Sequence, residues 1–286
     1  MCQIGDRMYK YTILTFIFND YEKIHEVVDP DPEAEYLLIT DDPELRSATW
    51  RVVCDQDLAG LPPFDKAFRV RYGLFKYASA DICVCIDGSI QIKKNFSHLI
   101  ADFIAGDYDI AMMAHAERDR FADEYAVWMN FRNYPARQRD KFFQMLKNAN
   151  YDLNFRGLYV SGFRIWRRTK LCADIDRMVM ALLTMLGDEN GIERLDQTVC
   201  SFVLNTFFRD INFMALSFQV VESDYMQLCR HKSDEPNFDV RFNTAYPDVH
   251  YVFNRLTLCR YLLPPGVSQP RWQPEPVKKH FTYSFK

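Results

Sequence analysis

The sequence predicts an α/β protein with a mostly parallel, Rossmann-like sheet flanked by helices, folded as a single domain. Of its 286 residues, 48% are hydrophobic and 26% are charged, which supplies one sizeable core and excludes wholesale disorder. Through about the first 115 residues, short apolar runs alternate with amphipathic stretches, a pattern typical of parallel strands joined by helices. We place the domain at residues 1–260 and a proline-rich tail, packed on the domain, at residues 261–286.

Five apolar runs are predicted to form strands. They are Tyr11–Phe18, Tyr36–Thr40, Trp50–Cys54, Asp81–Ile86 and Tyr108–Ala114. Four of the runs end in polar residues, namely Asn19-Asp20, Asp41-Asp42, Asp87 and His115. Ligands of parallel sheets bind beyond the carboxyl ends of the strands, so we expect a ligand site along this edge.

Helices are expected between and after these strands. The sequence predicts a helix from Lys66 to about Ala78 capped by Asp65, a helix from Ser97 to about Ala105, and charged helical segments within 117–150 broken at Pro135. It then predicts a strand or strand pair at Gly157–Trp166, a long helix from Thr169 to Gly187–Gly191, a helix capped by Asp196, and a strand near Asn212–Val221. On the first helix, Lys66, Arg69 and Lys76 form a stripe that is either solvated or aimed at a diphosphate.

Composition and missing motifs exclude several function classes. The net charge of -4 disfavours a nonspecific nucleic-acid binder. The glycine-rich dinucleotide motif, the P-loop, the serine-hydrolase elbow and the zincin motif are all absent from the sequence. The eight cysteines form no CxxC pair, and no apolar run approaches the ~18–20 residues that span a bilayer. We therefore expect free thiols and a cytoplasmic protein, for which peripheral membrane association stays open.

The sharpest local feature is Asp87 with the two residues after it. The strand Asp81–Ile86 delivers this carboxylate, and Gly88 allows close approach. A carboxylate at the end of a buried strand is unfavourable unless it is paired or coordinated. Divalent metals that a substrate diphosphate chelates use one or two such carboxylates. The alternative is a structural turn in which Asp87 is the capping residue and Gly88 supplies a positive φ.

These residues resemble the start of a known motif. The run Ile-Asp87-Gly88-Ser89-Ile is similar to the Asp-x-Asp segment of GT-A-fold, nucleotide-sugar-dependent glycosyltransferases of the bacterial capsule and lipopolysaccharide type. It is also similar to the Ile-Asp-Gly motif of a plant-and-bacterial glycosyltransferase-like family. In the GT-A fold this motif holds a metal and the donor diphosphate. The opening strand with Asn19-Asp20-Tyr21 resembles the nucleotide-binding start of the same enzymes.

Three further segments match in the expected order, and the resemblance covers roughly residues 9–210. Gly157–Arg168 looks like a segment that lines the sugar site, which places Ser161 and Gly162 near the donor sugar. Leu195–Asn205 resembles a helix start whose Asp-Gln pair, here Asp196 and Gln197, faces the reacting sugar. The stretch from His115 to Glu124 is similar to one in the plant-and-bacterial family, and the two residues at its ends are candidates to bind acceptor hydroxyls. A helix cap for Asp196 and a solvated helix face for Glu124 are the structural alternatives.

The departures from the family pattern concern the metal. Ser89 stands where the family has a second acidic residue, which removes one carboxylate from the metal shell. The third ligand in related enzymes is often a late histidine, and His231, His250 and His280 are the candidates. We take Asp87 and His280 as the expected ligands of a Mn or Mg ion.

The resemblance implies a hexosyltransferase-type enzyme that moves a sugar from a nucleotide diphosphate sugar to a glycan or glycolipid acceptor. Thr15, Asn19 and Asp20 would contact base and ribose, with help from Asp41 or Asp42. Lys66 and Arg69 would neutralise the diphosphate together with the metal, and Asp196 and Gln197 would act at the reacting sugar. The alternatives are a sugar nucleotidyltransferase and a catalytically degenerate protein of the same fold that binds a glycan or a partner.

Overall fold

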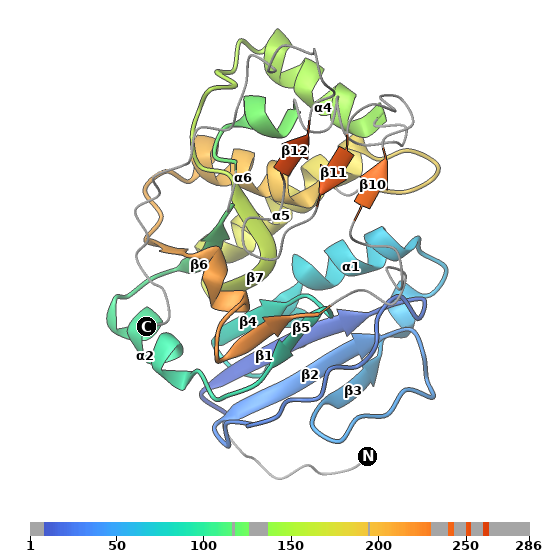
Figure 1. Ribbon diagram of the computed structural model, residues 1–286, viewed down its shortest axis with the longest axis vertical. Coiled ribbons are helices and arrows are strands. Elements are labelled where there is room, and N and C mark those ends of the chain that lie inside the picture. The colour runs from blue at the N-terminus through green and yellow to red at the C-terminus, as the bar shows by residue number, and fades with distance from the viewer. Residues whose placement is uncertain are drawn as a thin grey trace.

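The computed structural model describes residues 9–115, 118–125, 137–193 and 195–229, and the backbone of three short strands beyond them (Figure 1). The main sheet consists of β1 (Tyr11–Ile17), β2 (Ala34–Thr40), β3 (Arg51–Cys54), β4 (Ile82–Ile86), β6 (Ile110–Ala114), β7 (Tyr159–Arg167) and β8 (Phe213–Leu216). The helices are α1 (Pro63–Arg71), α2 (Ser97–Ala105), α4 (Arg137–Asn148), α5 (Lys170–Leu186) and α6 (Asp196–Phe207). Small sheets are formed by β5 (Ile90–Ile92) with β9 (Met226–Leu228), and by β10 (Val240–Phe242), β11 (His250–Val252) and β12 (Arg260–Leu262).

The seven strands of the main sheet follow the order β3-β2-β1-β4-β7-β6-β8. Every neighbouring pair is parallel except those that involve β7, which runs antiparallel to both β4 and β6. The prediction of an α/β fold with a mostly parallel sheet flanked by helices is therefore confirmed. The chain proceeds from β1 outward to β2 and β3, then returns to the other side of β1 as β4. The order of strands thus reverses between β1 and β4, and such reversals are where open α/β sheets bind ligands.

Two hydrophobic cores lie on the two faces of the sheet. Alternate residues of β1 point to opposite faces, so Leu14 belongs to the core that α1, α5 and α6 cover. Ile13 belongs to the core on the α2 side. Helices α5 and α6 lie side by side over the sheet (Figure 1).

The helix expected at Lys66–Ala78 is shorter than predicted and starts earlier. Helix α1 begins at Pro63, ends at Arg71, and is followed by a separate 3₁₀ turn at Leu74–Lys76. Asp65 lies in the first turn and is not the cap; its carboxylate accepts a hydrogen bond from the backbone N–H of Ile192 at 2.9 Å. The prediction that Lys66, Arg69 and Lys76 form one stripe on a single helix is therefore wrong, because Lys66 lies in α1 and Lys76 lies in the 3₁₀ turn.

Other boundaries agree more closely with the sequence. Thr169 caps α5 by accepting from the N–H of Cys172 at 3.1 Å, and Gly187 ends that helix as expected. The helix predicted at Ser97 has the expected bounds. The expected cap at Asp196 is wrong, because Leu195 is the N-cap and Asp196 is the first residue of α6. The strand expected near Asn212–Val221 is β8 followed by a 3₁₀ turn, Phe218–Val221.

Some expectations fall outside the described residues. Pro135 and residues 263–286 of the expected tail are among them, whereas β12 spans the expected domain boundary at 260.

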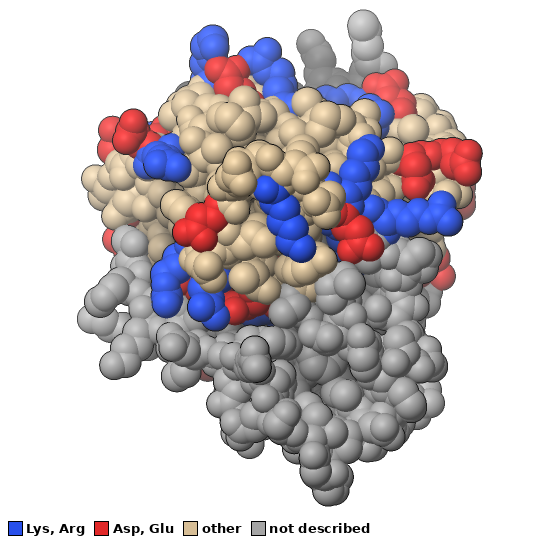
Figure 2. Space-filling model, turned by 90° about the horizontal axis from the view of Figure 1, so that it is seen from above, with Lys and Arg blue, Asp and Glu red and all other residues tan. Residues whose placement is uncertain are grey.

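All six cysteines in the described part of the chain are free thiols. Among the described residues, no helix has the length and hydropathy needed to cross a bilayer. On the face that Figure 2 shows, Lys and Arg side chains are interspersed with Asp and Glu.

Candidate functional site

A buried arginine joins the predicted residues at the carboxyl edge of the sheet. The guanidinium of Arg71, the last residue of α1, donates to the carboxylates of Asp87 and Asp196. It also donates to the hydroxyl of Ser161 at 3.1 Å, and that hydroxyl donates to Asp196 Oδ2 at 2.6 Å. Three predicted residues from separate motifs therefore meet around one side chain. We call Arg71, Asp87, Ser161 and Asp196 the arginine cluster.

The backbone fixes the position of Asp87 in this cluster. Asp87 follows the last residue of β4, and its N–H donates to the carbonyl of Gly162 in β7 at 2.8 Å. A Cβ atom at position 162 would lie 2.9 Å from Asp87 Oδ2. A side chain at position 162 would therefore have to displace the Asp87 carboxylate.

The turn after Asp87 explains the adjacent glycine. The N–H of Ile90 donates to the carbonyl of Asp87 at 2.9 Å, which closes a four-residue turn. The turn of the structural alternative is therefore present, but its expected positive φ at Gly88 is wrong, because Gly88 is not among the glycines with positive φ. A Cβ atom at Gly88 would instead lie 3.1 Å from the carbonyl oxygen of Phe16 in β1. The close approach expected of this glycine is therefore present. Ser89 is buried, and its carbonyl accepts from the N–H of Cys229 at 2.7 Å.

The charges of the arginine cluster do not balance. Burial lowers the pKa of Arg71, but Asp87 and Asp196 raise it more, so it lies well above its ordinary value. One guanidinium faces two carboxylates, which leaves one excess negative charge when both are ionised. The Asp196 side chain is 5% exposed and that of Asp87 is 31% exposed. Asp87 is therefore the member of the cluster that a ligand can reach.

A second polar group lies at the ends of β1 and β2. The buried Lys66 ammonium donates to Asp41 Oδ2 at 2.7 Å and to Asn19 Oδ1 at 3.3 Å. The N–H of Asn19 donates to Asp41 Oδ1 at 3.0 Å. Burial raises the pKa of Asp41, but its bonds from Lys66 and Asn19 outweigh burial and the pKa is lowered. Lys66 is engaged in this group and buried, so the structure does not offer it to a diphosphate.

The remaining residues expected near the nucleotide differ in exposure. Asn19 and Asp20 are exposed, with left-handed φ values of 55° and 52°. Thr15 is buried, and its hydroxyl has no hydrogen-bond partner among the described residues. Arg69 is exposed on α1, and Asp42 follows Asp41 in the loop after β2. The structure therefore brings Asn19 and Asp41 together and leaves Arg69 apart from both groups.

The residues expected at the acceptor form a third group. His115 follows β6 and accepts at Nδ1 from the N–H of Arg118 at 3.1 Å. The Arg118 guanidinium lies 2.7 Å from His115 Nε2 and is paired with the carboxylate of Glu124. All three residues are buried. His115 and Glu124 are thus joined through Arg118, and Glu124 does not lie on the solvated helix face considered as an alternative.

The remaining predicted residues are Gln197 and the three candidate metal-binding histidines. Gln197 is half-buried in the first turn of α6, where its carbonyl accepts from Ser201 Oγ at 2.8 Å. His231 and His280 lie outside the described residues, and only the backbone of His250 is described. The described part of the chain holds no group of three or more His, Cys, Asp or Glu side chains placed to bind a metal ion.

Sequence reasoning missed Arg71, which the structure places at the centre. The missed signal is positional: Arg71 follows Phe68 by three residues and therefore shares the apolar face of α1. A charged residue on a buried helix face requires a charged partner, whereas the selected Arg69 is exposed. The guanidinium also lies 5.2 Å from the centre of the Phe16 ring in β1.

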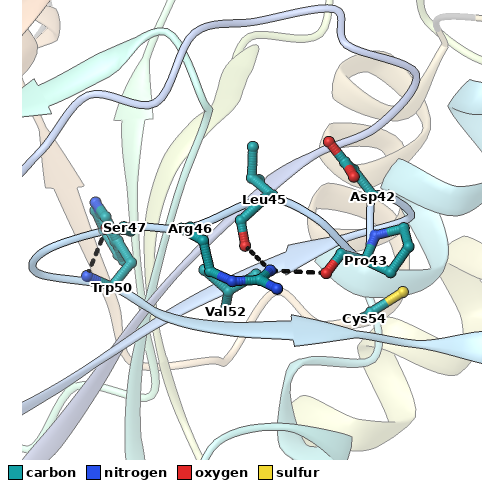
Figure 3. Close-up of a pocket in the computed structure, with 8 residues that line it drawn as sticks. All are labelled: Asp42, Pro43, Leu45, Arg46, Ser47, Trp50, Val52 and Cys54. Atoms are coloured by element: carbon teal, nitrogen blue, oxygen red, sulfur yellow. Dashed lines mark hydrogen bonds between the residues drawn. The ribbon is translucent and has the colours of Figure 1, made fainter.

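A pocket of about 340 Å³ lies apart from the arginine cluster, between β3 and the loop that precedes it (Figure 3). It is lined by Asp42, Pro43, Leu45, Arg46, Ser47, Trp50, Val52 and Cys54. The Arg46 guanidinium donates to the carbonyls of Pro43 and Leu45 at 2.7 and 2.8 Å. These bonds hold the loop itself together, and none of the predicted catalytic residues lines the pocket.

No family model matches the sequence, and no curated protein matches it either. Any function must therefore be argued from the chemistry of the carboxyl edge.

Proposed function

We propose that the protein is a GT-A-like glycosyltransferase that transfers a sugar from a nucleotide diphosphate sugar to a glycan or glycolipid acceptor. The observation that carries this proposal is the arginine cluster. The motif resemblance assigned Asp87 to the diphosphate, Ser161 to the donor sugar and Asp196 to the reacting sugar, each from a different segment. Ser161 donates a hydrogen bond to Asp196, and Arg71 donates hydrogen bonds to all three residues. The convergence of residues from three segments on one arginine supports a shared site.

The location of the cluster supports the same function. Asp87 follows β4 and Asn19 follows β1, the two strands between which the strand order reverses. A nucleotide bound at this reversal would contact both strand ends. Adjacent strands are roughly 4.8 Å apart, so a diphosphate and a ribose would bridge the ends of β1 and β4 without spanning the molecule.

The donor set fits a metal that arrives with the diphosphate. Arg71 occupies Oδ1 of Asp87, and the partly exposed carboxylate keeps Oδ2 as a second acceptor. Mg²⁺ and Mn²⁺ bound to diphosphates need only one or two protein carboxylates, and the excess negative charge of the cluster favours a cation. Such a metal would neutralise charge on the departing diphosphate.

The buried residues of the cluster have separate tasks in transfer. Arg71 provides a fixed positive charge beside Asp87, where negative charge grows on the leaving group. Asp196 accepts hydrogen bonds from Arg71 and Ser161, and a carboxylate near the anomeric carbon stabilises an oxocarbenium-like centre. Gln197, in the same helical turn, would offer a neutral polar contact.

Substitution of Asp87 tests the proposal. We expect Asp87→Asn to abolish donor hydrolysis and sugar transfer and to weaken nucleotide binding in the presence of Mn²⁺. The melting temperature should change little, because Arg71 keeps its pair with Asp196. The measurements are thermal-shift titrations with nucleoside diphosphates and their sugars, with and without Mn²⁺, and a donor-hydrolysis assay. Asp81→Asn, an exposed change at the opposite end of β4, is the matched control. Wild-type turnover by Asp87→Asn removes this residue from the mechanism.

One observation favours a second candidate, a catalytically degenerate protein of the same fold that binds a glycan or a partner. Arg71 engages both carboxylates of the cluster, and Ser89 stands in place of the second acid. Nucleotide-dependent stabilisation without donor hydrolysis would support it. Release of pyrophosphate from a nucleoside triphosphate and a sugar phosphate would indicate a nucleotidyltransferase.

We also propose that the acceptor binds near His115 and Glu124, and that the protein is cytoplasmic.

A further inference from the structure

The side-chain amide of Asn19 has a defined orientation. Its Oδ1 atom lies 3.3 Å from the ammonium nitrogen of Lys66. A lysine ammonium has three hydrogen-bond donors and no acceptor, so the oxygen of the amide and not its NH₂ group must face it. Nδ2 is therefore directed away from Lys66. Asn19 is exposed, so this NH₂ group is available to a ligand.

Three contacts keep the amide in this orientation. The Lys66 ammonium is fixed by Asp41 at 2.7 Å, and its side chain is only 8% exposed. The same Asp41 accepts from the backbone N–H of Asn19 at 3.0 Å. Asn19 and Asp20 both have left-handed φ values, a conformation that asparagine and aspartate tolerate better than most residues. A flipped amide would place two donors, Nδ2 and the ammonium, against each other.

We propose that Asn19 selects the base of the nucleotide, favouring bases with a ring carbonyl over bases with an exocyclic amine. This inference rests on the proposed function, which places the nucleotide at the ends of β1 and β4. Uracil and guanine present an oxygen acceptor where cytosine and adenine present an NH₂ donor. The outward Nδ2 of Asn19 bonds the oxygen and opposes the amine. Lys66 and Asp41 act on the base through Asn19 and are positioning residues.

The expected selectivity follows from the loss of a hydrogen bond. An amine base would leave both its own NH₂ group and that of Asn19 unpaired in the contact. A mismatch of this kind corresponds to about ten- to a hundredfold in affinity. We therefore expect UDP and GDP to bind at least ten times more tightly than CDP and ADP.

The test is a calorimetric titration of the full chain with UDP, GDP, CDP and ADP at fixed Mg²⁺. The informative variant is Asn19→Asp, which keeps an oxygen toward Lys66, tolerates the same φ, and presents an outward acceptor in place of a donor. We expect it to reverse the order, so that CDP and ADP bind more tightly than UDP and GDP. Asn154→Asp, an exposed change of the same charge after α4, should leave the order unchanged.

The outcomes separate the two proposals. If wild type binds all four nucleotides with equal affinity, or prefers CDP and ADP, the selection by Asn19 is overturned and the proposed function stands. A carbonyl preference that Asn19→Asp leaves intact also overturns it. If none of the four nucleotides binds, both proposals fall. A carbonyl preference in wild type that reverses only in Asn19→Asp establishes the inference.

Discussion

At the scale of single residues, the contact between Gly162 and Asp87 offers the most direct test of the site geometry. We expect Gly162→Ala to weaken Mg²⁺-dependent nucleotide binding by about tenfold or more, because the new methyl group would lie 2.9 Å from Asp87 Oδ2 and displace the carboxylate. Overpacking of this kind also lowers the free energy of unfolding by about 1–3 kcal/mol. Urea denaturation and nucleotide titration measure the two effects.

A double-mutant cycle provides the control for this residue. Asp87→Ala removes the atom that the new methyl group meets, so Gly162→Ala should destabilise that background less than it destabilises wild type. Strictly additive losses in the cycle would show that the two side chains do not share this space.

At the scale of elements, helix α5 depends on its cap. The hydroxyl of Thr169 accepts from the N–H of Cys172, one of the otherwise unpaired donors of the first turn. Thr169→Ala should lower the free energy of unfolding by about 0.5–2 kcal/mol. Thr184→Ala, an exposed change near the other end of the same helix, should be neutral or slightly stabilising because alanine has the higher helix propensity. Equal losses from both variants, measured by urea denaturation, would contradict a capping role.

At the scale of the whole molecule, a buried ion pair links stability to pH. Arg164 in β7 and Asp176 in α5 are both buried, and their nearest charged atoms are 3.8 Å apart. Burial raises the pKa of Asp176 to about 7, although Arg164 lowers it in part. In the unfolded chain an aspartate titrates near pH 3.9. The folded state therefore binds the proton more tightly, and its stability falls as pH rises from about 4 to 7.

Comparison of two unfolding series checks this pH dependence. The contribution of Asp176 should reach at most about 1.4 kcal/mol per pH unit, and Asp176→Asn should remove it. Glu35 and Asp41, whose pKa values are lowered, contribute the opposite slope at lower pH, so the difference between variant and wild type is the quantity to measure. Asp224→Asn, at an exposed site, should leave the slope unchanged. A slope that is identical in wild type and Asp176→Asn would exclude Asp176 as its source.

Much of the fold was predictable because strands and caps leave local signals. Continuous apolar runs and the polar residues after them located β1, β2, β4 and β6, and Thr169 marked the start of α5. Arg71 was not predictable from the same signals, because two of its partners, Ser161 and Asp196, lie far along the chain in β7 and α6. Asp196 resembles an ordinary helix cap in sequence, and only the tertiary contact with Arg71 shows that its carboxylate is used elsewhere. Local patterns report local geometry and do not report which distant side chains neutralise a buried charge.

The reversed direction of β7 has a consequence for how this architecture tolerates change. Asp87 leaves the sheet at the end of one strand while Gly162 and Ser161 enter it near the start of the next, and ladder hydrogen bonds between β4 and β7 set their separation. No connecting loop determines that distance. Insertions and deletions in the loops between these strands can therefore accumulate over generations without altering the spacing of Asp87, Ser161 and Gly162.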